Sequence, residues 1–125
     1  MKLQDIQAVY FIGAGGIGMS ALVRYFHHKG LVVAGYDKTP TDLTRRLEKE
    51  GIQLHYEDNI NLIPDVCKNP STTLVVYTPA IPNTHSELIY FRENHFEIEK
   101  RAQVLGRLTQ THKGLCFAEI GRAHV

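Results

Sequence analysis

The 125-residue sequence contains little cysteine and no long apolar run, and each absence excludes a class of protein. Its two cysteines, Cys67 and Cys116, stand far apart without a Cys-x-x-Cys motif, which disfavours a disulfide scaffold or a zinc site. We therefore expect two buried, reduced thiols and no bound metal. No apolar run approaches the roughly 20 residues that cross a bilayer, and residues 1–7 lack a basic and then apolar leader. The sequence predicts a cytoplasmic protein without a membrane partner.

An excess of one charge is also missing. Fourteen Lys and Arg residues stand against thirteen Asp and Glu residues, and neither sign occurs in blocks. A protein that binds the backbone of a nucleic acid neutralises phosphates with clustered Lys and Arg. We therefore expect no nucleic-acid partner. Hydrophobic residues make up 43% of the chain and charged residues 22%, which is typical of one soluble globular domain.

Short apolar runs alternate with helical patterns along the chain. The runs predicted as strands are residues 8–12, 31–36, 52–56, 74–77 and 96–98, with a sixth at 115–118. Helices are predicted from residue 17 to a stop at Gly30, from Thr39–Thr41 to Gly51, from a cap at Asn83 or Thr84 to about Arg92, and over 102–108. The pattern predicts an α/β fold, a Rossmann-like, doubly wound and mostly parallel sheet with helices on both faces.

The expected ligand site follows from that topology. Doubly wound sheets bind ligands outside the carboxyl ends of their strands. The loops after Ile12, Tyr36 and Tyr77 are therefore the places where we expect the chemistry of this chain.

A glycine-rich turn follows the first predicted strand directly. It reads Gly13-Ala14-Gly15-Gly16-Ile17-Gly18, a G-x-G-x-x-G motif that precedes a predicted helix. Gly13 allows the tight turn, Gly15 lets the backbone approach a pyrophosphate, and Gly18 lets the helix pack closely on the strand. The N–H groups and the positive dipole end of the helix then face the anion. A turn that merely eases packing is the alternative, but the flanking strand and helix favour phosphate binding.

A carboxylate stands at the end of the second predicted strand. Asp37 follows Gly18 by nineteen positions, where an acidic side chain accepts hydrogen bonds from a nucleotide's ribose or base. A solvated Asp at a strand end is the alternative. The same spacing fits a nicotinamide dinucleotide, so the glycine turn and Asp37 leave NAD and other diphosphates equally open.

Three segments of the sequence distinguish between NAD and other diphosphates: Tyr10–Ser20, Gly35-Tyr36-Asp37 and Val76–Pro82. Together they closely resemble the family of UDP-N-acetylmuramate:L-alanine ligases. The resemblance extends from about Ile6 to Ala118 and includes Lys100-Arg101-Ala102-Gln103. It implies that residues 1–118 form the Rossmann-like domain that binds UDP-N-acetylmuramate. In this family a second domain binds ATP with Mg²⁺, and a third recognises the L-alanine that is joined to the sugar nucleotide in peptidoglycan synthesis.

The resemblance also assigns two groups of residues to the sugar nucleotide. The first group binds the diphosphate and consists of Gly13, Ala14, Gly15, Gly16, Ile17 and Gly18. Within it, the backbone N–H groups of Gly15, Gly16, Ile17 and Gly18 are expected to face the diphosphate. The second group lies at the uridine and sugar end and consists of Asp37, His55, Asn59, Thr78, Ala80, Ile81 and Arg101. No residue of the chain is implied to be catalytic.

Several members of the second group have simpler alternatives. Thr78 offers a hydroxyl near the phosphates but is also suited to cap a strand end. His55 and Asn59 match a family His-x-x-x-Asn element near the uracil pocket, although Leu54 replaces its usual glycine, and an ordinary surface His is the alternative. Arg101 is suited to face the sugar nucleotide, or to be solvated or salt-bridged. The remaining histidines, His85 among them, are expected to be structural or on the surface.

The sequence departs from the family after Ala118. There the family continues into a Gly-Thr-His-Gly-Lys-Thr loop for ATP, whereas this chain reads Glu-Ile-Gly-Arg-Ala-His-Val over 119–125, like a translated sequencing adapter. We interpret 119–125 as a non-native tail. We expect no cofactor in this chain, no catalysis by it alone, and missing central and C-terminal domains as its natural partners. An NAD-binding domain of a dehydrogenase or regulatory protein remains the alternative, and a separate UDP-sugar-binding module is a third.

Overall fold

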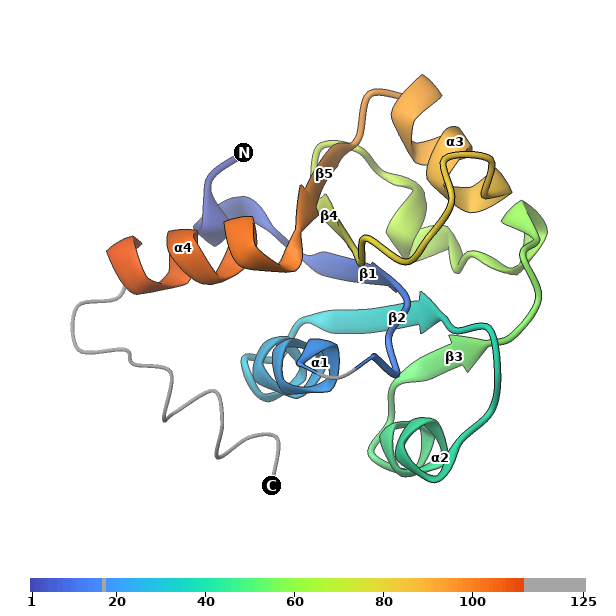
Figure 1. Cartoon of the computed structure of the whole chain (residues 1–125). Helices are drawn as coiled ribbons and strands as arrows, with labels where there is room; N and C mark the ends of the chain where they lie inside the picture. Colours follow the sequence, from blue (N-terminus) through green and yellow to red (C-terminus); the bar gives the residue numbers. More distant parts are fainter. Residues whose placement is uncertain (17, 112–125) are drawn as a thin grey trace.

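A computed structural model of the chain describes residues 1–16 and 18–111. Within them, five parallel strands form one sheet in the order β3-β2-β1-β4-β5 (Figure 1). The central strand, β1, is buried at all five positions, as its continuous apolar run predicts. The strands are β1 (Ala8–Ile12), β2 (Val32–Tyr36), β3 (Gln53–His55), β4 (Thr73–Tyr77) and β5 (Glu97–Lys100).

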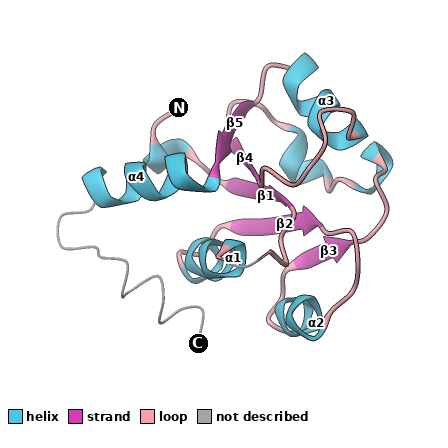
Figure 2. Ribbon diagram, in the orientation of Figure 1, coloured by secondary structure: helices cyan, strands magenta, loops and turns pink. Residues whose placement is uncertain are grey.

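Helices cover both faces of this sheet (Figure 2). One face packs against α1, α2 and α4 and includes Phe11 of β1 and Leu47 of α2. The other face packs against α3 and the 3-10 helix η3 and includes Tyr10, Cys67 and Phe91. The predicted Rossmann-like, doubly wound fold is confirmed. The helices are α1 (Met19–His28), α2 (Asp42–Lys49), α3 (Ser86–Glu93) and α4 (Arg101–Thr111), with 3-10 helices η1 (Leu3–Asp5), η2 (Ile60–Leu62) and η3 (Asp65–Lys68).

The N-terminal caps of α2 and α3 differ in kind. Thr41 begins α2 through a capping box, in which its side chain accepts from the Thr44 N–H and the Thr44 hydroxyl accepts from the Thr41 N–H. The predicted cap of α3 at Asn83 or Thr84 is wrong. His85 caps that helix instead, because its Nδ1 accepts a hydrogen bond of 3.4 Å from the Leu88 N–H.

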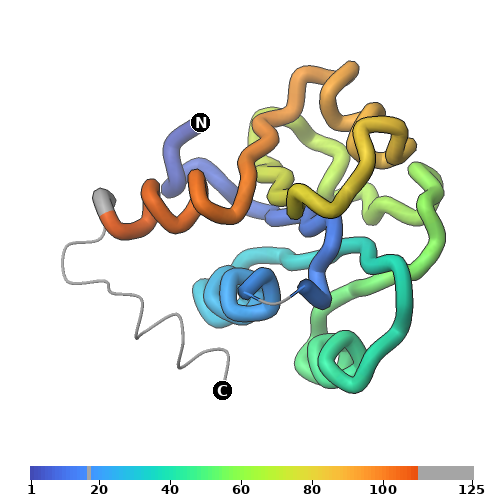
Figure 3. The backbone as a smooth tube through the Cα atoms, in the orientation of Figure 1, coloured from blue at the N-terminus to red at the C-terminus, as the bar shows by residue number. Residues whose placement is uncertain are grey.

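The two ends of the described chain meet beside β5. The N-terminal ammonium of Met1 lies 3.3 Å from Glu97 Oε1, and Arg107 of α4 bonds both to the Met1 carbonyl and to Glu99. Figure 3 shows the N-terminal segment running beside α4. These contacts fix α4 against the sheet, and with it Arg101, the first residue of that helix.

Some expectations lie on other parts of the chain. Cys67 is buried and free, as predicted, and its burial raises the pKa of the thiol to about 12. Cys116, the strand predicted over 115–118, the 119–125 tail and Ile17 all lie outside the described residues.

Candidate functional site

A cleft of about 440 Å³ opens at the carboxyl ends of β1, β2 and β4. Gly13 and Gly16 after β1, Asp37 after β2, and Thr78 after β4 all line it. The order of strands reverses between β1 and β4, which is the switch point where doubly wound sheets bind ligands. All three loops singled out from the sequence therefore meet in one hollow.

A larger hollow, of about 660 Å³, lies near the N-terminus of the chain. Leu3, Tyr25, Phe26 and Leu31 contribute to its lining, together with Leu108 of α4. It lies away from the glycine turn and the loops that follow the strands. We assign the ligand site to the smaller cleft because only there do polar groups from several strands converge on a helix N-terminus.

The backbone of the glycine turn uses several of its own N–H groups. Gly13 and Ala14 donate to the Tyr36 carbonyl at 2.7 and 3.0 Å, and Gly16 donates to the Gly13 carbonyl at 3.1 Å. The N–H groups predicted to face a diphosphate are those of Gly15, Gly16, Ile17 and Gly18, and of these the Gly16 N–H is already engaged within the turn. The N–H groups of Gly15 and Gly18 donate to no other residue within the described part of the chain, which leaves them available to a ligand.

Two glycines of the turn have positive φ, and both meet a predicted site residue. Gly13 (φ +97°) and Gly18 (φ +83°) adopt the left-handed region that favours glycine. A Cβ on Gly13 would lie 3.0 Å from the Thr78 side chain, and one on Gly18 would lie 3.0 Å from the Arg101 guanidinium. The structure thus brings Thr78 and Arg101, from the ends of β4 and β5, against the turn.

The space beside Gly15 is filled by protein atoms. A Cβ there would collide with the Asp37 carboxylate and would lie 2.6 Å from the Thr44 methyl group. The nearest obstacles to a side chain at Gly15 are Asp37 and Thr44, so glycine is favoured here even without a ligand.

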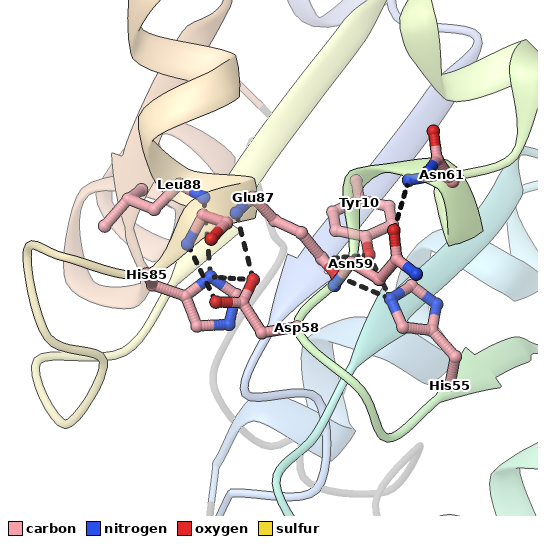
Figure 4. Close-up of polar contacts among 9 residues, drawn as sticks. Tyr10, His55, Asp58, Asn59, Asn61, His85, Glu87 and Leu88 are labelled. Atoms are coloured by element: carbon pink, nitrogen blue, oxygen red, sulfur yellow. Dashed lines mark hydrogen bonds and ion pairs between the residues drawn. The ribbon is translucent and has the colours of Figure 1, made fainter.

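Three residues predicted for the uridine and sugar end do not line the cleft: Arg101, which lies beside Gly18, and the two network residues His55 and Asn59. His55 Nε2 is 2.7 Å from Glu87 Oε2 and 3.1 Å from the Tyr10 hydroxyl, and the Asn59 N–H donates to the same Glu87 oxygen at 3.1 Å (Figure 4). The Asn59 side chain accepts from the Asn61 N–H. His55 and Asn59 are therefore held in a network centred on the buried Glu87 rather than on the cleft wall.

The Glu87 network is built around a buried carboxylate. Glu87 is fully buried, and the Tyr10 hydroxyl donates to its Oε1. Burial raises the pKa of Tyr10, and the Glu87 carboxylate raises it further, so the phenol stays protonated and remains a donor. Sequence analysis missed Glu87, because a charged residue in the first turn of a helix is ordinarily solvated.

Beside this network, Asp58 and His85 stand on the cleft wall. The Asp58 carboxylate accepts from the N–H groups of Ser86 (2.8 Å) and Glu87 (3.1 Å), at the start of α3. The His85 ring contacts the Tyr36 ring with centroids 4.6 Å apart. Burial, followed by the carboxylates of Asp58 and Glu87, raises the pKa of Tyr36. Asp58 and His85 were not predicted as site residues.

Within residues 1–16 and 18–111, no three His, Cys, Asp or Glu side chains gather as metal ligands would. Over the same residues, no helix has the length and apolar character needed to span a bilayer.

Comparison with known proteins decides the family. The model of the Mur ligase family, catalytic domain, matches residues 8–113. The chain belongs to the Mur ligase family.

Among the relatives of this Mur ligase chain, the UDP-N-acetylmuramate–L-alanine ligase of Phocaeicola vulgatus is 62% identical over 118 residues. The match covers 94% of this chain and 26% of that protein. The enzyme of the same name from Parabacteroides distasonis is 60% identical over the same length. The chain thus spans about a quarter of the length of the curated relatives it matches.

Solved structures agree with the fold. The crystal structure of UDP-N-acetylmuramate-alanine ligase MurC from Thermotoga maritima superposes with a TM-score of 0.75 at 28% identity, covering 85% of this chain and 23% of that one. A ligase from Neisseria meningitides, named for UDP-N-acetylmuramate and a diaminopimelate-containing peptide, gives a TM-score of 0.69 at 18% identity, covering 85% and 31%. The second likeness shows the fold alone.

Proposed function

We propose that this chain is the UDP-N-acetylmuramate-binding domain of an ATP-dependent UDP-N-acetylmuramate:L-alanine ligase, a cytoplasmic enzyme of peptidoglycan synthesis. The observation that carries the proposal is the cleft where the glycine turn, Asp37 and Thr78 meet. The names of the most similar relatives support the choice of sugar nucleotide, and membership of the Mur ligase family does not favour an NAD-binding domain.

In this proposal the diphosphate lies against the start of α1. The N–H groups of Gly15 and Gly18, which no described residue engages, donate to its oxygens, and the positive end of the helix dipole adds about 0.3–1 kcal/mol. The Thr78 hydroxyl reaches the turn from β4, and the Arg101 guanidinium beside Gly18 neutralises part of the charge.

The uridine end lies towards β2 and the loop after β4. Asp37 accepts from a ribose hydroxyl, and Ala80 and Ile81 line the same cleft. His55 and Asn59 then have an indirect role: both hydrogen-bond to Glu87 and hold it at the start of α3.

ATP and Mg²⁺, which the family implies, do not fit the residues of this chain. The sequence lacks a glycine-rich loop ending in Lys-Ser or Lys-Thr, and the described residues form no cluster of metal ligands. The central and C-terminal domains of the ligase are therefore the proposed source of ATP binding and alanine recognition, and this chain alone is expected to be inactive.

Calorimetric titration of the 125-residue chain tests the proposal. We expect UDP-N-acetylmuramate and UDP to bind, and NAD to bind more weakly than either. Replacing Asp37 with Ala is expected to weaken UDP binding by about 10-fold, because a carboxylate that accepts from a ribose hydroxyl is lost.

Asp65→Ala is the matched control, since the Asp65 side chain is fully exposed on η3 and lines no part of the cleft. Tighter binding of NAD than of UDP would overturn the proposal.

A further inference from the structure

His85 carries an unused polar atom into the wall of the cleft. The residue is only 6% exposed, and its Nε2 has no hydrogen-bond partner among residues 1–16 and 18–111. A buried polar group left unpaired costs roughly 1–3 kcal/mol, and most native examples have a partner or a function. His85 is also one of the residues that line the cleft.

The other ring nitrogen is already engaged. The Leu88 N–H donates to Nδ1 as the cap of α3, so Nδ1 presents a lone pair and the ring proton lies on Nε2. Figure 4 shows the Nδ1 side of the ring at Asp58 and the start of α3, with Nε2 on the side away from the helix. The ring therefore holds a preoriented donor, fixed by the cap and by the edge contact with Tyr36.

We propose that His85 Nε2–H donates a hydrogen bond to an uncharged oxygen of the uridine, which makes His85 a specificity residue of the nucleotide site. This inference rests on the function proposed above.

Charge favours the nucleoside over the diphosphate as the partner. The Asp58 carboxylate lies 3.3 Å from His85 Nδ1 and lines the same cleft, so a phosphate at this point would face a like charge. Uridine carbonyl and hydroxyl oxygens carry no charge and accept from a neutral donor. The neighbouring walls, formed by Tyr36, Ile81 and Pro82, suit a flat base and a ribose better than an anion.

Two substitutions separate the two nitrogens of His85. In His85→Asn the side-chain amide reaches the place of Nδ1, so the helix cap is kept while the Nε2 donor is lost. In His85→Gln the amide nitrogen reaches the place of Nε2, so the donor is kept while the cap is lost. His28→Asn, at the exposed end of α1, is the matched control.

Calorimetry with UDP and thermal melts are measured on each variant. We expect His85→Asn to melt near the wild type but to bind UDP about 3- to 10-fold more weakly, the effect of one neutral hydrogen bond. His85→Gln is expected to bind UDP within about twofold of the wild type while melting roughly 4–8 °C lower.

The outcomes distinguish this inference from the function on which it rests. Wild-type chain that binds UDP, together with a His85→Asn variant of equal affinity, overturns the role of Nε2. Equal weakening in the Asn and Gln variants shows that His85 acts only by placing α3, and also overturns it. Failure of the wild-type chain to bind UDP refutes the proposed function itself, and the inference with it.

Discussion

Replacing Gly15 with Ala tests whether the glycine turn is shaped by neighbouring side chains. A Cβ at this position would lie 2.6 Å from the Thr44 methyl group, well inside van der Waals contact, and would collide with Asp37. Gly15 lacks a positive φ, so contact rather than backbone strain is the source of the cost. The Asp37 carboxylate is the end of a side chain on the cleft wall and can rotate away.

Thr44 cannot move so easily. It is fully buried, and its hydroxyl both accepts from the Thr41 N–H at 2.8 Å and donates to the Thr41 carbonyl at 3.0 Å. Turning its methyl group away would break the capping box of α2. We therefore expect Gly15→Ala to destabilise the domain by about 1–2 kcal/mol, an overpacking cost partly offset by the lower entropy of the unfolded chain.

The companion substitution Thr44→Ser removes that methyl group and keeps the hydroxyl. We expect the double variant to be more stable than the sum of the two single effects by about 1 kcal/mol, measured by urea denaturation followed by circular dichroism. UDP binding is expected to be weak in Gly15→Ala and equally weak in the double variant, because in both the new Cβ displaces Asp37. Gly106→Ala, where a Cβ meets nothing within 4 Å, is the control and is expected to stabilise α4. Additivity within about 0.3 kcal/mol would refute the contact between Gly15 and Thr44.

Three further predictions concern buried or paired groups. Glu87→Gln is expected to lower the free energy of unfolding by about 1–3 kcal/mol, because the bonds from Tyr10 and Asn59 lose their charged acceptor; an unchanged urea midpoint would contradict this. The Arg24 guanidinium lowers the pKa of Glu50 below 4.5, so the bridge stabilises the domain above that pH and the stabilisation is lost as pH falls through the folded pKa. Glu50→Gln is expected to cost only about 0.2–1 kcal/mol at pH 7, because Glu50 is partly exposed. Its stability should converge with that of the wild type as pH falls through the folded pKa of Glu50, and a difference that stays constant with pH would speak against the pair. The Cys67 thiol has a pKa raised to about 12 by burial, so it is expected to resist a thiol reagent at pH 8 while the protein is folded and to react promptly once the protein is unfolded in urea. The Cys116→Ser variant is used so that Cys67 is the thiol that is measured.

The fold was predictable because each signal was local and repeated. The apolar run of β1 is buried along its whole length, and the β2 run ends at Tyr36 immediately before the Asp37 that lines the cleft. Topology rules then place the carboxyl ends of these strands at one edge without further information. The same rules correctly bring Thr78, Ala80 and Ile81 into the cleft.

The polar network behind the cleft could not be predicted in this way. Glu87 has its main partner in Tyr10, 77 residues earlier, and nothing in either local sequence indicates that the two side chains meet. Asn and Thr are common capping residues, yet His85 caps α3 instead of Asn83 or Thr84. Tertiary packing against Tyr36 fixes the His85 ring in that position. Contacts between side chains that are so far apart in the sequence depend on how the whole sheet is assembled.

The glycine turn explains why the sequence motif left two ligands open. Each of its three spaced glycines meets a side chain from another part of the sheet edge: Gly13 meets Thr78, Gly15 meets Asp37 and Thr44, and Gly18 meets Arg101. Glycine is favoured at these positions before any ligand arrives, by protein contacts and, at Gly13 and Gly18, by positive φ. A G-x-G-x-x-G spacing therefore reports the close convergence of strand ends and not the identity of the diphosphate. Discrimination between ligands must then lie in the side chains that converge there. In this chain they are a carboxylate, a hydroxyl, a guanidinium and, on the same cleft wall, the buried ring of His85.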